Sequence, residues 1–100
     1  MRKDQELAIP PGALEDPHSR EMLRAWIAKG GLHCSLQIGA WKDKEAIAWG
    51  IVLSDAARHV ADALAKEKGI SREETLAAIR ESFDREMESP TSDTEGNFVQ

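Results

Sequence analysis

The side chains of this sequence with the widest chemical range are three histidines and one cysteine, and two of these four are adjacent. His33 and Cys34 lie in the alternating run from Leu32 to Ile38, which is typical of a β-strand. Because adjacent side chains of a strand leave on opposite faces, His33 and Cys34 cannot bind one metal ion together. We therefore expect Cys34 to be a small buried hydrophobic residue rather than a nucleophile.

His59 follows Asp55 by four residues and precedes Asp62 by three. On a helix this spacing could bind a metal ion or tune a base, but it equally describes a surface imidazole beside solvated carboxylates, which we favour. The sequence contains no GxSxG, HExxH, P-loop, paired CxxC or GxGxxG pattern. It therefore predicts no catalytic residue, metal ligand or cofactor, and argues against an enzyme without excluding one.

Trp26 is the residue best suited to contact a partner or a ligand. It shares the polar face of a predicted hairpin with Arg24 and His33, and a tryptophan between a cation and an imidazole can form a contact hot spot or a ligand shelf. If the arm or the tail covers this face, Trp26 is instead part of the core. The candidate contact or pocket residues, placed where the hairpin meets the next helix, are Trp26, His33, Arg24, Arg58 and His59.

Two alternating runs on either side of Gly30-Gly31 predict the β-hairpin that carries these residues. With Gly30-Gly31 as a two-residue turn, Ile27 lies opposite Cys34. A turn at Lys29-Gly30 shifts the partners but keeps the same two faces. A rival interpretation is a helix over 17–29 that ends at Gly30, and a short helical turn leading into the strand reconciles the two.

A long helix is predicted from Lys44 to Lys68, with Asp43 as its N-cap and Gly69 as its left-handed terminator. A capping box of Ser71 and Glu74 starts a second helix at Arg72. The apolar residues of the long helix recur at helical spacing and are expected to face the core. They are Trp49, Leu53, Ala56, Val60, Ala63 and Leu64.

This order predicts one α+β domain of ββαα type, in which the hairpin packs on two consecutive helices. Three prolines between Leu7 and Pro17 predict an extended N-terminal arm rather than a helix. The domain is expected to span residues 7–88, after a flexible segment at 1–6 and before a polar, mobile tail at 89–100.

The strand from Leu32 to Ile38 has no charge and no proline, which are the features that normally protect an edge strand. Either the N-terminal arm or a second copy of the chain is therefore expected to pair with it. Two hairpins that meet edge to edge about a twofold axis would form a four-stranded sheet. We expect a homodimer.

Charge argues against a nucleic-acid partner, because the net charge of −5 comes entirely from the second half of the chain. No run approaches the roughly 18 apolar residues of a membrane span, and the first residues lack the apolar core of a signal peptide. A single cysteine cannot form an internal disulfide, so we expect a cytoplasmic protein.

Four short stretches resemble a family of small bacterial proteins, common in alpha-proteobacteria, known as domain of unknown function 5076. They are Trp26, Gly30-Gly31-Leu32-His33, Ala48-Trp49-Gly50 and Ala57-Arg58-His59-Val60. The resemblance covers about residues 7 to 96 and implies a single domain from a bacterial cytoplasm. It implies no activity, cofactor or catalytic residue.

Three hypotheses about function follow. We favour a cytoplasmic homodimer that serves as a protein-interaction module, with an unidentified protein as its further partner. The alternative is a small-ligand-binding protein or accessory enzyme with a pocket near Trp26 and His33. The acidic charge most disfavours the third, a nucleic-acid-binding regulator.

Overall fold

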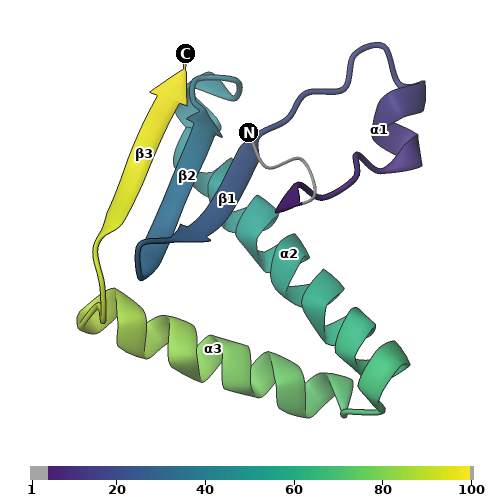
Figure 1. Ribbon diagram of the computed structural model, residues 1–100, viewed down its shortest axis with the longest axis vertical. Helices are drawn as coiled ribbons and strands as arrows, with labels where there is room; N and C mark the ends of the chain where they lie inside the picture. Colours follow the sequence, from purple (N-terminus) through teal and green to yellow (C-terminus); the bar gives the residue numbers. More distant parts are fainter. Residues whose placement is uncertain (1–4, 100) are drawn as a thin grey trace.

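Figure 1 shows a computed structural model, which describes residues 5–99. Residues 1–4 of the predicted flexible segment 1–6 lie outside the described residues. The predicted α+β class and ββαα order are confirmed. The elements are α1 (Pro11–Glu15), β1 (Leu23–Ala28), β2 (Gly31–Gln37), the 3-10 helix η2 (Lys42–Lys44), α2 (Glu45–Lys68), α3 (Arg72–Glu88) and β3 (Thr94–Val99).

The hairpin of β1 and β2 turns at Lys29-Gly30, one residue earlier than the preferred prediction. Ala28 pairs with Gly31 and Ile27 with Leu32, so the alternative register is the observed one. Lys29 and Gly30 have φ angles of 52° and 78°, which is the pair of positive values that a tight hairpin turn requires. The two faces are the predicted ones. Moving the turn by one residue changes each cross-strand partner by two residues, from Cys34 to Leu32 for Ile27, and residues two apart in a strand share a face.

The C-terminal segment is a third strand, although the sequence predicted a mobile tail over 89–100. β3 runs parallel to β2, with Leu32 opposite Thr94 and Leu36 opposite Phe98. A Cβ atom at position 96 would overlap the backbone carbonyl of Cys34, so the glycine permits this close approach. All six residues of β3 are exposed. Its mostly polar sequence therefore lacks the alternation of apolar and polar residues from which a strand is predicted.

β2 is therefore the central strand of a β1-β2-β3 sheet. This corrects the expectation that the N-terminal arm or a second copy of the chain pairs with the open edge of the strand from Leu32 to Ile38. It pairs with β1 on one side and with β3 on the other, and even the N–H of Ile38 donates to the carbonyl of Val99. An unpaired β2 edge can no longer support a dimer.

Both long helices begin within one residue of their predicted starts, and α2 ends at the predicted Lys68. Gly69 ends α2 with a left-handed φ of 67°, and the Glu74 N–H donates to Ser71 Oγ at 3.2 Å at the start of α3. The N-cap assigned to Asp43 is wrong. The backbone N–H of Trp41 instead donates to the Glu45 carboxylate at 3.0 Å, so the first residue of α2 stabilises its own start.

The N-terminal arm is present, but it contains the short helix α1. Pro11 occupies the first helical position, where its missing N–H costs no hydrogen bond. The apolar side chains of the arm do not anchor it to a core, because Leu7 is 95% exposed and Ile9 and Leu14 are also exposed.

The helices of one chain do not cover its sheet. Between the described strands and helices α2 or α3, no two Cα atoms lie within 8 Å. In Figure 1 the sheet, α2 and α3 form three sides of an open triangle, with α2 and α3 meeting only near the loop that joins them. Among residues 5–99, only Ala61 and Thr75 are buried.

The chain consequently exposes much more surface than a compact monomer. Its accessible area is 8661 Å², whereas a compact monomer of its mass exposes about 5,700 Å². Its radius of gyration is 15.3 Å, compared with about 13 Å for a typical domain of this length. A single chain therefore lacks a sizeable hydrophobic core.

Candidate functional site

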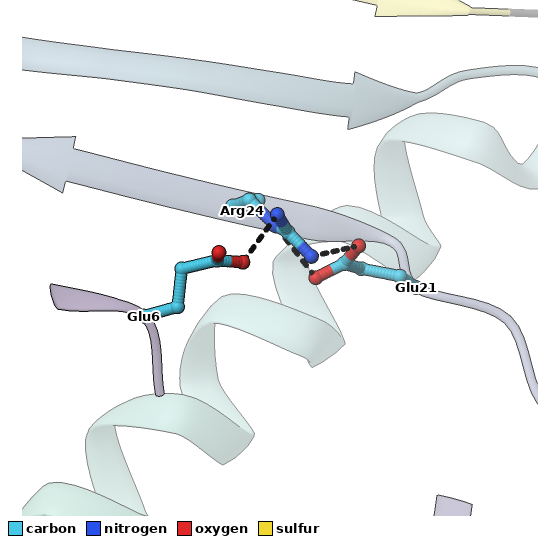
Figure 2. A network of polar contacts seen from close by, with 3 residues as sticks. All are labelled: Glu6, Glu21 and Arg24. Carbon is cyan, nitrogen blue, oxygen red and sulfur yellow. Dashed lines mark hydrogen bonds and ion pairs between the residues drawn. The ribbon is translucent and has the colours of Figure 1, made fainter. Parts of the chain in front are cut away.

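Arg24 joins the N-terminal arm to the sheet through two carboxylates (Figure 2). Its Nε and Nη2 atoms donate to the two carboxylate oxygens of Glu21 at 3.1 and 3.2 Å, and its Nη1 atom donates to Glu6 at 3.2 Å. The hydrogen bond and the negative charge of Glu21 raise the pKa of Arg24, with a smaller contribution from Glu6. The guanidinium thus holds the arm beside β1.

A cavity of 630 Å³ lies between the arm and β1, next to this ion-pair network. Arg24 and Trp26 line it from the sheet, and Val52 lines it from α2. Leu23 and Ala25 of β1 also line it, and the remaining lining comes from the arm and from the segment that leads into β1. Its volume falls in the range of small-molecule sites, and a mixed apolar and charged lining is typical of them.

The structure brings together three of the five predicted contact residues. Trp26 lies directly opposite His33 in the hairpin, and Arg24 shares their face. Arg24 and Trp26 line the cavity, while His33, Arg58 and His59 are not among its lining residues. Two of the five predicted contact residues therefore line the cavity, and α2 contributes Val52 to it rather than Arg58 or His59.

The carboxylates next to His59 in sequence are used by arginines. Arg58 forms an ion pair with Asp55, and Arg72 of α3 donates to Asp62 at 2.6 Å. Within residues 5–99, no group of three His, Cys, Asp or Glu side chains is arranged to hold a metal ion. The Arg72–Asp62 pair links α3 to α2 near their connecting loop.

Glu45 is a structural residue that the sequence analysis missed. Trp49 Nε1 donates to its carboxylate at 2.9 Å, and the Trp41 and Trp49 rings meet edge to face at 5.9 Å. Partial burial raises the pKa of Glu45, but hydrogen bonds from the Trp41 N–H, the Trp49 indole and the Gly39 N–H outweigh it, so the pKa is lowered overall. Tryptophans four residues before and after a glutamate were the available sequence signal.

The opposite face of the sheet is an apolar surface that none of the helices in the described part of the chain covers. Ile27 on β1 is 82% exposed and Phe98 on β3 is 64% exposed. The sequence missed the contribution of β3, because Phe98 stands in an otherwise polar tail. We call this surface the apolar sheet face. It consists of Leu23, Ala25, Ile27, Leu32, Cys34, Leu36 and Phe98.

The apolar sheet face carries two large apolar side chains that are mostly exposed, Ile27 and Phe98. Exposed apolar patches beyond a few hundred Å² mark sites of protein or ligand contact. None of the helices within residues 5–99 is both long enough and apolar enough to cross a bilayer. The arrangement can therefore bind a complementary apolar surface at the apolar sheet face and a small molecule in the cavity between the arm and β1.

Comparison with known proteins agrees with the resemblance seen in the sequence. The family described as domain of unknown function (DUF5076) matches residues 6–91. The chain is also similar to a solved structure, described as that of a candidate pyruvate dehydrogenase from the photosynthetic bacterium Rhodopseudomonas palustrus CGA009. The two are 29% identical, each is covered over 100% of its length, and the TM-score is 0.70. No curated protein matches the chain. Because the family match spans most of the sequence, the chain belongs to the DUF5076 family.

Proposed function

We propose that this protein is a small bacterial, cytoplasmic homodimer that serves as a protein-interaction module. The observation that supports the proposal most strongly is that residues 5–99 of one chain form no sizeable hydrophobic core. The accessible area of one chain exceeds that of a compact monomer by about 3,000 Å², starting from the 8661 Å² that it exposes. A standard interface buries only about 800 Å² per partner. Contact with a second copy over a large apolar area would remove this excess.

The apolar sheet face and the acidic helices supply two different surfaces for docking. The sheet face offers aliphatic and aromatic contacts, such as Ile27 and Phe98. The net charge of −5 favours a partner with a basic surface and speeds its approach. The free thiol of Cys34 supports a reducing compartment.

Static light scattering tests the dimer directly. At a concentration of about 50 µM we expect a mass twice the 11.1 kDa of one chain. A folded species with the mass of a single chain at that concentration would overturn the proposal. For docking, Ile27→Asp should reduce the recovery of specific partners from a native lysate, and Ala77→Asp, at an exposed position of α3, should leave it unchanged. Equal recovery with both variants would remove the sheet face as the docking surface.

Ligand binding is a second candidate, favoured by the 630 Å³ cavity that Arg24 and Trp26 line. The guanidinium suits an anionic ligand and the indole suits an apolar or planar one. Because the similar bacterial protein is described as a candidate pyruvate dehydrogenase, pyruvate and other 2-oxo acids are the first ligands to test.

Thermal unfolding with these acids tests the second candidate. A ligand at 100 times its dissociation constant stabilises the folded state by about 2.7 kcal/mol, which raises the melting temperature by several degrees. Trp26→Leu should abolish this shift, and His59→Ala, which lies outside the cavity lining, should preserve it. No shift with any acid in the wild-type protein would contradict binding of this ligand class.

A further inference from the structure

Helix α2 carries a second apolar surface whose residues are spaced like one strand of a coiled coil. Trp49, Leu53, Ala56, Val60 and Ala63 follow one another at intervals of four, three, four and three residues. This is the alternation of the two apolar positions in a heptad. We call these five residues the α2 seam. Leu53 is 44% exposed and Val60 is 47% exposed, and Ala56 and Ala63 are also exposed.

The partner helix within the chain cannot cover the seam, because it contacts a different side of α2. Within residues 5–99, α3 is the only long helix that contacts α2. The fully buried Ala61 and the half-buried Leu64, both in the last two turns of α2, mark the side that faces it. At 100° per residue, the centre of the seam lies about a third of a turn away from Ala61. α3 also diverges from α2 along its length (Figure 1), and four of the five seam residues are exposed, whereas Trp49 is half-buried.

We propose that the α2 seam packs against the α2 seam of a second copy, with the two helices antiparallel and crossing at Ala56. The proposal rests on the homodimer proposed above and names its interface. An antiparallel pair about a twofold axis places Ala56 opposite itself and Leu53 opposite Val60 of the second copy. It also places Trp49 opposite Ala63 of the second copy.

The side-chain sizes favour this direction over a parallel pair. In the antiparallel pair the largest seam residue, Trp49, meets the small Ala63, and the two alanines at the crossing point allow the backbones to approach closely. In a parallel pair each residue would face its own copy. Two tryptophans would then collide at one level while paired alanines left a gap at another.

The charges of α2 also fit burial of this side. The positions that flank the seam are uncharged along its first two heptads, where they are occupied by Gly50, Val52, Ala57 and His59. The charged residues Asp55, Arg58 and Asp62 lie on the other side of the helix. Pairing of two seams therefore buries no unpaired charge at its centre, which would otherwise be costly.

The first test uses a matched pair of alanine-to-arginine variants. Ala56→Arg places a charge at the crossing point, whereas Ala77→Arg makes the same change at an exposed position of α3. By light scattering, we expect Ala56→Arg to weaken dimerisation at least about 100-fold and Ala77→Arg to leave it within about threefold of the wild type. Undiminished dimerisation of Ala56→Arg would overturn the interface.

Because Ala56→Arg can also prevent folding, cross-linking provides a second measurement. The variant Cys34→Ser/Ala56→Cys carries one cysteine at the crossing point, and Cys34→Ser/Ala77→Cys carries one on α3. Mild oxidation should convert the first into a covalent dimer nearly completely and leave the second mostly uncross-linked. Equal cross-linking of the two, or none at position 56, would contradict the proposal.

The outcomes separate this inference from the proposed function. A monomeric wild-type protein would overturn both. If the wild type is dimeric, the Cys34→Ser/Ala56→Cys variant does not cross-link and the Ala56→Arg variant still dimerises, the homodimer stands and only the α2 interface is overturned.

Discussion

Two sides of the same helix have opposite environments in a single chain. On one side of α2, Ala61 is fully buried against α3, while the adjacent seam residue, Val60, remains 47% exposed. Both sides are apolar and both repeat at helical spacing. The comparison shows that apolar periodicity identifies the residues that need burial, but does not specify whether the covering element comes from the same chain.

The largest loss of stability is expected for a substitution on the side of α2 that faces α3. Ala61→Asp places a charge in a fully buried position with no room for a counterion, so we expect a loss of about 3 kcal/mol or more in the free energy of unfolding. Urea denaturation followed by circular dichroism measures it. Ala78→Asp, at an exposed position of α3, is the matched control. A loss below about 1 kcal/mol for Ala61→Asp would contradict the assigned contact.

An intermediate loss of stability is expected for a substitution in the α2 seam. Val60→Asp should cost about 2 kcal/mol, but through dissociation rather than through loss of a contact within the chain. Its stability should therefore recover partly when the protein concentration is raised, whereas that of Ala61→Asp should not. Identical concentration dependence for the two variants would mean that the two sides of α2 are not distinct.

A smaller effect is expected where α3 begins, at the end of the α2–α3 contact. Ser71 Oγ accepts the Glu74 N–H, and removal of such a cap in Ser71→Ala should cost about 1 kcal/mol. Ser82→Ala, inside α3, should cost nothing, because alanine is the better helix former. The urea midpoints of the two variants provide the comparison, and it fails if they shift equally.

The smallest effect is a pH dependence at the start of α2, before the seam. The pKa of Glu45 is lowered from its usual value of 4.5, so its stabilising contribution is present above pH 4.5 and is lost as the pH falls through the folded-state pKa. Glu45→Gln should therefore differ most from the wild type near neutral pH and least in acid. Unfolding curves at several pH values measure this, and a difference that grows in acid would refute the role of the carboxylate.

Local features of the fold were predictable from sequence, since they depend on neighbouring residues. The Ser71 cap, the Gly69 terminator and the two faces of the hairpin each follow from a few adjacent side chains. The turn lies at Lys29-Gly30, one residue before the preferred Gly30-Gly31. The sequence pattern did not separate the two positions, because both leave the same residues on each face of the hairpin. The cap at Asp43 was wrong, because Asp43 lies inside the 3-10 helix η2 and Lys44 occupies the N-cap position of α2 without a side-chain hydrogen bond.

Long-range features were harder to predict. β3 has little strand signal of its own, and it is placed by pairing with β2 rather than by its composition. The cavity beside Arg24 and Trp26 depends on how the arm folds back, which the ion pair with Glu6 helps to fix. The seam was identified correctly as an apolar stripe, but its expected cover within the chain is absent from residues 5–99.

The central claim is that the core of this protein is completed between two copies, so that folding and assembly are one reaction. The most direct measurement is the thermal unfolding midpoint of the wild-type chain over a hundredfold range of protein concentration. Mass action then adds about 2.7 kcal/mol across that range, and we predict that the midpoint rises steadily with concentration. A midpoint that stays constant over the whole range would contradict the account.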